Sequence, residues 1–222
     1  MTEHSRWYRV AGACLLIAAL LGTTGVWADA AADMEAKRQA AAQRTRRIIF
    51  DNDGNEPVYY CKEATAEELL AQRTAPLVGS QVDTIFYCTW SSGFGYFTHD
   101  TKVGTPFICT AEEKGKGPGS GFSKNKTQAF FDQGADPLEI MVEFCRKHDI
   151  EIFWSMRMND THDAWNAWYS PHMFPPIKRE HPEWLMGTRK KRPKNGAWSA
   201  VDYGHPEIRD LAFRFFEEVC TN

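Results

Sequence analysis

Short apolar runs alternate along the chain with longer amphipathic stretches, and this alternation predicts β-strands and α-helices in turn. Residues 47–50, 82–88 and 150–156 combine β-branched and aromatic residues over lengths that are typical of strands. The first run leads into Asp-Asn-Asp-Gly-Asn at 51–55, a composition typical of a turn. We therefore expect three strands separated by helical segments.

A helical pattern follows each of these runs. Thr65 and Glu68 have the spacing of a capping box, which predicts a helix that Pro76 shortens at its end. Asp136, which precedes a proline, predicts the start of a second helix. The third helix is expected to begin near Pro206 and to continue towards the last residues of the sequence.

Strand followed by helix, three times, predicts an α/β fold with a parallel sheet, because parallel neighbours need crossover connections. The loops after the strands are long, at 89–133 and 157–204, whereas those after the helices are short, at 79–81 and 148–149. This asymmetry is typical of a (β/α)8 TIM barrel, whose site lies on the loops at the carboxyl ends of its strands.

A doubly wound parallel sheet is the structural alternative. That fold usually carries a glycine-rich phosphate turn after its first strand, and the acidic turn at 51–55 would repel a pyrophosphate. From residue 47 onward the chain supplies only about three strand–helix units, where a barrel has eight. We therefore expect the N-terminal part of a TIM barrel in a truncated chain.

The beginning of the chain has the pattern of a secretory signal peptide. Arg6 and Arg9 precede an apolar run at 10–21, and Ala28 offers a small residue for cleavage. The run is shorter than the ~20 residues that a spanning helix needs, so no stable membrane anchor is expected after cleavage. The predicted organisation is a signal peptide at 1–28, an Ala- and Arg-rich tether or helix at 29–46 and a partial barrel at 47–222. Such a protein is exported to the periplasm or the extracellular space.

Composition narrows the choice of partners. The formal net charge is −3, so there is no basic surplus to neutralise a phosphate backbone, and no nucleic-acid partner is expected. Eight tryptophans are many for 222 residues.

Without Cys14, which lies in the predicted signal peptide, the cysteines are odd in number and irregularly spaced. They form no evident disulfide framework, although one bridge remains open.

Polar and aromatic side chains gather after all three predicted strands. Carboxylate and amide groups bind sugar hydroxyls, and flat aromatic rings stack on the apolar side of a pyranose. This mixture suits a neutral, polyhydroxylated substrate better than a phosphate. The candidates for substrate binding are Asp51, Asn52, Trp90, Arg157, Asn159 and Asp160.

Each candidate also has a purely structural interpretation. Residues 51–55 can form a turn only, and Trp90 can roof the barrel. Arg157 can pair with a neighbouring carboxylate, either Asp51 or Asp160. The later tryptophans fit a carbohydrate platform and a hydrophobic lid equally well; they are Trp165, Trp168 and Trp184.

Asp160, His162 and Asp163 together resemble half of a metal site. No second histidine stands two or four residues away, which is the spacing that would complete it. We therefore expect neither a metal nor another cofactor.

Four segments resemble exported bacterial proteins with a glycoside-hydrolase-like (β/α)8 domain, related to the glycosyl hydrolase-like 10 group. They lie at 51–55, 86–91, 153–160 and 201–209. The last segment opens a helix with Asp-x-x-x-Pro-Glu-x-Arg, a pattern found before the fourth strand of many retaining sugar-hydrolase barrels. The resemblance covers residues 47–222 and implies a carbohydrate partner.

In such barrels the catalytic carboxylates usually lie at the ends of strands four and seven. The resemblance therefore implies catalytic residues beyond Asn222, with the near half of a substrate groove in this chain and no activity of its own. Two other functions stay open. One is a non-catalytic carbohydrate-binding barrel, and the other is a metal-dependent sugar deacetylase using Asp160, His162 and a later histidine.

Overall fold

The computed structural model describes residue 29 and residues 32–221. The predicted signal peptide lies outside these residues. The chain divides into two compact units, residues 1–46 and 47–222. Within the first unit, residues 32–43 form an exposed helix.

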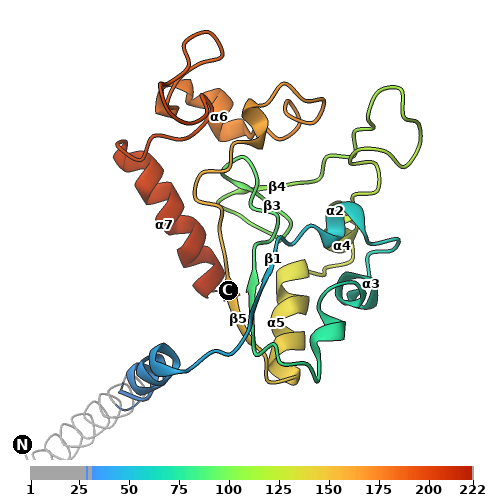
Figure 1. The fold of residues 1–222 in the computed structure, drawn as a ribbon, viewed down its shortest axis with the longest axis vertical. Coiled ribbons are helices and arrows are strands. Elements are labelled where there is room, and N and C mark those ends of the chain that lie inside the picture. The colour runs from blue at the N-terminus through green and yellow to red at the C-terminus, as the bar shows by residue number, and fades with distance from the viewer. Residues whose placement is uncertain (1–28, 30–31, 222) are drawn as a thin grey trace, which may run out of the picture. The chain divides into compact units, whose positions relative to one another are not determined.

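A parallel sheet of three strands forms the centre of the second unit (Figure 1). The strands are β1 (Ile49–Asn52), β2 (Thr84–Tyr87) and β5 (Glu151–Trp154), in the order β1-β2-β5. Ile85 is the register partner of Phe50 on one side and of Ile152 on the other. The predicted α/β class with a parallel sheet is confirmed.

Helices begin where the capping residues predict. The Thr65 hydroxyl accepts a hydrogen bond from the Glu68 N–H at the start of α3 (Ala66–Ala71). This helix is shorter than its hydrophobic pattern suggests, because Pro76 lies in a separate 3-10 turn, η1 (Ala75–Leu77). Asp136 caps α5 (Pro137–Lys147) through the Leu138 N–H. The last helix, α7, spans Pro206–Thr221.

Two of these helices cover the same face of the sheet. Tyr87 and Trp154 are register partners, so their side chains point to one side. On that side Met141 and Cys145 of α5 pack around Tyr87. Phe216 of α7 contacts Trp154, with ring centroids 5.1 Å apart. In Figure 1, α5 and α7 flank the strands from either side of the view.

The opposite face of the sheet carries Ile49, Phe86 and Phe153, together with the polar residues Asp51, Thr84 and Glu151. The rings of Phe86 and Phe153 meet edge to face at 5.3 Å. Ile49 keeps 46% of its surface exposed and Phe153 keeps 39%. Within the described part of the chain, none of the buried hydrophobic clusters includes these three residues.

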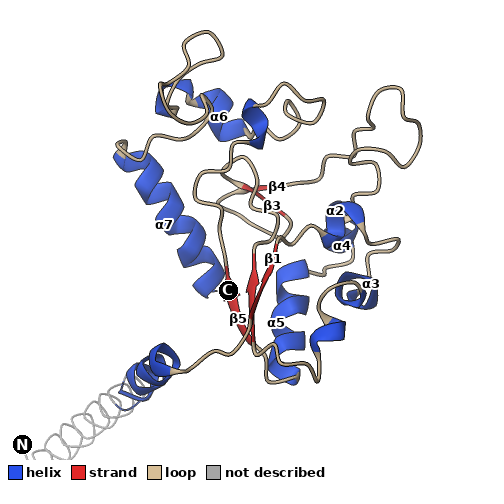
Figure 2. Ribbon diagram, viewed as in Figure 1, coloured by secondary structure: helices blue, strands red, loops and turns tan. Residues whose placement is uncertain are grey.

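The long loops after the strands contain short elements that the hydrophobic pattern did not predict (Figure 2). After β1 comes α2 (Glu56–Tyr59). Between β2 and β5 lie the paired strands β3 (Tyr96–Phe97) and β4 (Thr105–Pro106), and the helix α4 (Thr127–Asp132). After β5 come η2 (His162–Ala164), α6 (Pro176–Glu180) and η3 (Pro182–Trp184).

Two further observations concern the described residues only. Their cysteines are all free thiols, namely Cys61, Cys88, Cys109, Cys145 and Cys220. None of their helices combines the length and the apolar character needed to cross a membrane.

Candidate functional site

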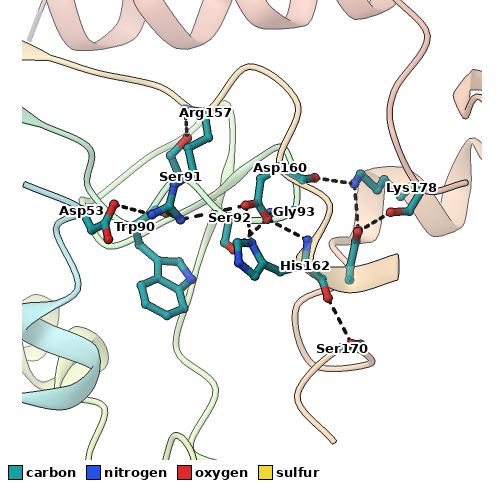
Figure 3. Close-up of polar contacts among 12 residues, drawn as sticks. Asp53, Trp90, Ser91, Ser92, Gly93, Arg157, Asp160, His162, Ser170 and Lys178 are labelled. Carbon is teal, nitrogen blue, oxygen red and sulfur yellow. Dashed lines mark hydrogen bonds and ion pairs between the residues drawn. The ribbon is translucent and has the colours of Figure 1, made fainter. Parts of the chain in front are cut away.

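Arg157 links the carboxyl ends of all three strands (Figure 3). Its guanidinium forms an ion pair at 2.5 Å with Asp53, which follows β1, and donates to the Trp90 carbonyl after β2 at 3.2 Å. Its own backbone N–H donates to the Ser91 hydroxyl. Two carboxylates were expected to pair with Arg157, namely Asp51 and Asp160. The Asp160 carboxylate lies 4.0 Å from the Arg157 guanidinium, and Asp53 forms the ion pair in place of Asp51.

Asp160 is the most heavily bonded carboxylate of this cluster. It accepts hydrogen bonds from the Gly93 N–H at 2.9 Å and the Ser92 hydroxyl at 3.1 Å. Its other oxygen lies 2.6 Å from Nδ1 of His162. Burial disfavours the charged form, but the donors from Gly93 and His162 outweigh it, so the pKa of Asp160 is lowered.

His162 is held by Asp160 while its ring stays partly exposed. The imidazole ring lies against Trp165, with centroids 4.9 Å apart. A carboxylate that is hydrogen-bonded to Nδ1 fixes the orientation of an imidazole ring. The pair therefore holds an imidazole ring in a fixed orientation at the exposed edge of the site, and His162 was not among the candidates for substrate binding.

Three consecutive residues after β2 have left-handed backbone conformations. The φ angles of Thr89, Trp90 and Ser91 are 44°, 69° and 36°. A non-glycine residue in this conformation costs of order 1–3 kcal/mol, and it persists only where surrounding contacts enforce it. Strain of this kind gathers at functional sites, which favours the strand ends as the site.

Contacts from two other strand ends enforce this turn. The Thr89 hydroxyl accepts a hydrogen bond from Nε1 of Trp154 at 2.9 Å. Gly54 packs so closely that a Cβ there would lie 2.5 Å from the Thr89 backbone nitrogen. The loops after β1, β2 and β5 therefore form one interlocked layer.

Trp90 lies in the core and not on the surface of the site. Only 6% of it is exposed, and its ring stacks on Phe107 and meets Tyr59 edge to face. The indole points away from the Arg157 guanidinium (Figure 3). The interpretation of Trp90 as a packing residue fits this position, and little of its ring is left for a ligand.

Asn52 and Asn159 hold the loops together. Buried Asn52 donates to Glu56 at 2.9 Å and accepts from the Gly54 N–H at 3.0 Å. Asn159 exchanges two hydrogen bonds with the backbone of Val201. In both amides the nitrogen and the oxygen each take part in one of these contacts.

Asp51 stands apart from the cluster. It is exposed, and it is the register partner of Phe86 on the opposite face of the sheet from Asn52. The structure thus brings together Trp90, Arg157 and Asp160 of the predicted set. Asn52 and Asn159 support their loops, and Asp51 lies outside.

Exposed aromatic rings border the polar cluster. Trp165 is 55% exposed, and its ring lies 6.4 Å from that of Tyr169. Burial and the phenol of Tyr169 raise the pKa of Tyr59 to about 12. Tyr60 extends this row beyond Tyr59. Of the three tryptophans considered as a platform, Trp165 is the one with a largely exposed ring.

A buried ion pair supports the loop that carries Asp160 and His162. Nζ of Lys178 lies 2.8 Å from Asp163, and both side chains are almost fully buried. Asp163 also accepts from the Ser199 hydroxyl, and Lys178 donates to the Asp160 carbonyl at 3.3 Å. Burial lowers the pKa of Lys178 and raises that of Asp163.

A separate cavity of about 950 Å³ lies between α5 and α7. Its lining includes His99, Trp154 and Phe216, and none of the polar cluster at the strand ends. Burial lowers the pKa of His99 to about 4. The lining also includes Ile152 and Phe153, so the cavity runs along the outer edge of β5.

Among the residues that the structure describes, no group of three His, Cys, Asp or Glu side chains is placed to hold a metal ion. A comparison with known protein families finds no match for the chain. A search of curated proteins finds no significant relative.

Proposed function

We propose that the chain binds carbohydrate at the carboxyl ends of its sheet, as the first three strand–helix units of a glycoside-hydrolase-like (β/α)8 barrel. We propose more specifically that the complete barrel hydrolyses a glycoside. A barrel that binds carbohydrate without cleaving it is the alternative, and it uses the same site.

Two features of the sheet support a barrel arrangement. The strands follow one another in sequence order, and α5 packs on the face that carries Tyr87, where α7 contacts the edge strand at Trp154. The other face carries apolar residues that remain partly exposed, as in the inward face of a parallel barrel. The loops at the carboxyl ends are the long ones, which is where barrel sites lie.

One observation carries the proposal of a carbohydrate site. At the strand ends, Asp53, Arg157 and His162 keep part of their side chains exposed around buried Asp160, and His162 contacts the exposed ring of Trp165. Charged oxygen and nitrogen groups bind hydroxyls, and an exposed indole offers a flat apolar surface to a sugar ring. The neighbouring Tyr169 and Tyr59 extend this surface.

The metal-dependent deacetylase receives less support. The Asp160 carboxylate is already engaged by Gly93, Ser92 and His162. Nδ1 of His162 is engaged by the same carboxylate, so only its other nitrogen faces a ligand.

Affinity electrophoresis of the full chain in gels that contain dextran, xylan or mannan tests the proposal. We expect at least one of these polysaccharides to retard the protein. Replacement of Trp165 by alanine should weaken this binding ~tenfold, because one stacked ring contributes about that much. The matched control is Phe213→Ala, which removes an exposed ring from α7.

Two results contradict the proposal. The first is that none of the polysaccharides retards the protein, although the protein is folded and unfolds cooperatively. The second is an equal loss of retardation in Trp165→Ala and Phe213→Ala.

A further inference from the structure

A hairpin close to the candidate site carries a dense cluster of positive charge. Residues 186–200, called here the basic hairpin, contain Thr-Arg-Lys-Lys-Arg-Pro-Lys at 188–194. Five of these seven residues are cations, in a chain whose net charge is −3. All five are exposed.

Backbone contacts give the basic hairpin a defined shape. The Met186 N–H donates to the Ala200 carbonyl at 2.8 Å, and the Gly187 N–H donates to the Trp198 carbonyl at 3.1 Å. Gly187 also fits closely against the turn at 188–191, since a Cβ there would lie 2.7 Å from the Lys191 carbonyl oxygen. The charges therefore stand on a folded element.

The positive charges of the basic hairpin lack local compensation. Within the described residues, none of its five cations forms an ion pair with a carboxylate. Exposed lysines elsewhere in the second unit do form such pairs, as Lys102 does with Asp100 and Lys116 with Glu113. Arg189 instead lies over the ring of Trp198, 5.4 Å from its centroid.

The base of the basic hairpin is fixed to the loop that carries His162. Nε1 of Trp198 donates to the Ala164 carbonyl at 3.2 Å, and the Ser199 hydroxyl donates to Asp163. Asn159 binds the backbone at Val201, where the second strand of the hairpin ends. A polymer that lies on the strand-end site thus passes close to an uncompensated positive surface.

We propose that the basic hairpin binds acidic groups along a glycan, so that the chain prefers polysaccharides bearing carboxylates or sulfates. This inference rests on the proposed carbohydrate site and names the class of its ligand. Arginine matches carboxylate and sulfate oxygens with two parallel hydrogen bonds, and lysines add point charges beside it. Several adjacent charges are needed, because single exposed ion pairs contribute little.

A glycan suits this surface better than a nucleic acid does. The exposed ring of Trp165, next to His162, offers a flat surface to a sugar ring. Nucleic acid and anionic lipid are therefore outcomes that the test must exclude.

The test measures binding of the full chain to dextran, dextran sulfate and polygalacturonate at low and moderate salt. The hairpin variant is Lys190→Gln/Lys191→Gln/Arg192→Gln. The control variant, Lys62→Gln/Lys114→Gln/Lys147→Gln, removes the same charge from exposed positions elsewhere. We expect the hairpin variant to lose at least about tenfold in affinity for the charged polymers and to show a weaker salt dependence.

The control variant should bind within about twofold of the original protein, and both variants should bind dextran unchanged. The charged polymer that binds more tightly identifies the preferred acidic group. Equal binding of dextran and both charged polymers by the original protein overturns the inference and leaves the carbohydrate site intact. No binding of any polymer overturns both proposals.

Three further results would also reject the acidic glycan. An equal loss in the control variant would show that only the overall charge matters. Tighter binding of single-stranded DNA than of polygalacturonate or dextran sulfate would identify a nucleic-acid surface. Tighter binding of phosphatidylglycerol vesicles would identify a lipid surface.

Discussion

Asp160 shows how a single side chain can join two loops. Its carboxylate accepts from the backbone N–H of Gly93 and the hydroxyl of Ser92 in the loop after β2. It also accepts from the N–H and Nδ1 of His162 in the loop after β5. With only 3% of its side chain exposed, Asp160 depends on these donors to remain charged.

We predict that Asp160→Asn destabilises the protein by about 2 kcal/mol at pH 7, since charge-assisted hydrogen bonds are lost. The lowered pKa of Asp160 means that its contribution is present above the unfolded pKa of about 3.9 and is lost as the pH falls through the folded pKa. Urea unfolding measures the free energy of unfolding of both proteins at pH 7 and at pH 3. The difference between the original protein and the variant should be smaller at pH 3. The control Asp210→Asn, at an exposed position on α7, should change stability by less than about 0.5 kcal/mol. A difference that is independent of pH would contradict this prediction.

At the scale of elements, the loop after β5 is long but firmly held. The buried pair Lys178–Asp163 joins α6 to η2, and Ser199 brings in the base of the basic hairpin. Removing one member of such a pair leaves an uncompensated buried charge, which is more damaging than removing both.

We therefore predict that Lys178→Met destabilises the protein by about 3–5 kcal/mol. The double variant Lys178→Met/Asp163→Leu should recover much of that loss, because no isolated charge remains. Thermal unfolding monitored by circular dichroism measures both, with Lys147→Met on the exposed side of α5 as the control. A double variant that is less stable than Lys178→Met would show that the pair itself contributes net stability.

The sequence predicts the elements whose signals are local. The caps at Thr65 and Asp136 and the apolar runs of the three strands all specify their own structure. The short pairing of β3 with β4 gives no such signal, because each has only two residues in strand conformation and depends on packing around them.

The sequence predicts where the candidate site lies, but it predicts only some of the residues that form it. The carboxyl ends of parallel strands must meet, so Arg157 and Asp160 follow from the fold class. The burial of Trp90 depends on Phe107, Phe122 and the turn at 89–91, contacts that no local pattern contains. The choice of Asp53 over Asp51 follows from the end of β1 at Asn52, because Asp53 lies in the loop beyond the strand whereas Asp51 lies within it.

For the molecule as a whole, the apolar face of Ile49, Phe86 and Phe153 is the least protected surface of the sheet. Contiguous apolar patches of this kind mark interaction sites or promote association. Ile49 and Phe153 lie on the two outer strands of the three, so the patch spans the sheet.

We predict that the full chain binds a hydrophobic dye such as anilinonaphthalene sulfonate through this face. The variant Ile49→Thr/Phe153→Thr should lower the dye fluorescence, because it removes apolar surface while keeping residues that suit strands. Val78→Thr, which changes an exposed residue outside the sheet, should leave it unchanged. Equal fluorescence in all three proteins would contradict the prediction.

The order of the strands also determines how the protein folds. Arg47 and Asp83, which join β1 to β2, are 36 residues apart in the chain. Thr84 and Glu151, which join β2 to β5, are 67 apart, and Asp53 and Arg157 are 104 apart. Each pairing closes a large loop, and high contact order slows folding. The Arg157 cluster needs all three strand ends, so the candidate site is completed only after the slowest of these closures.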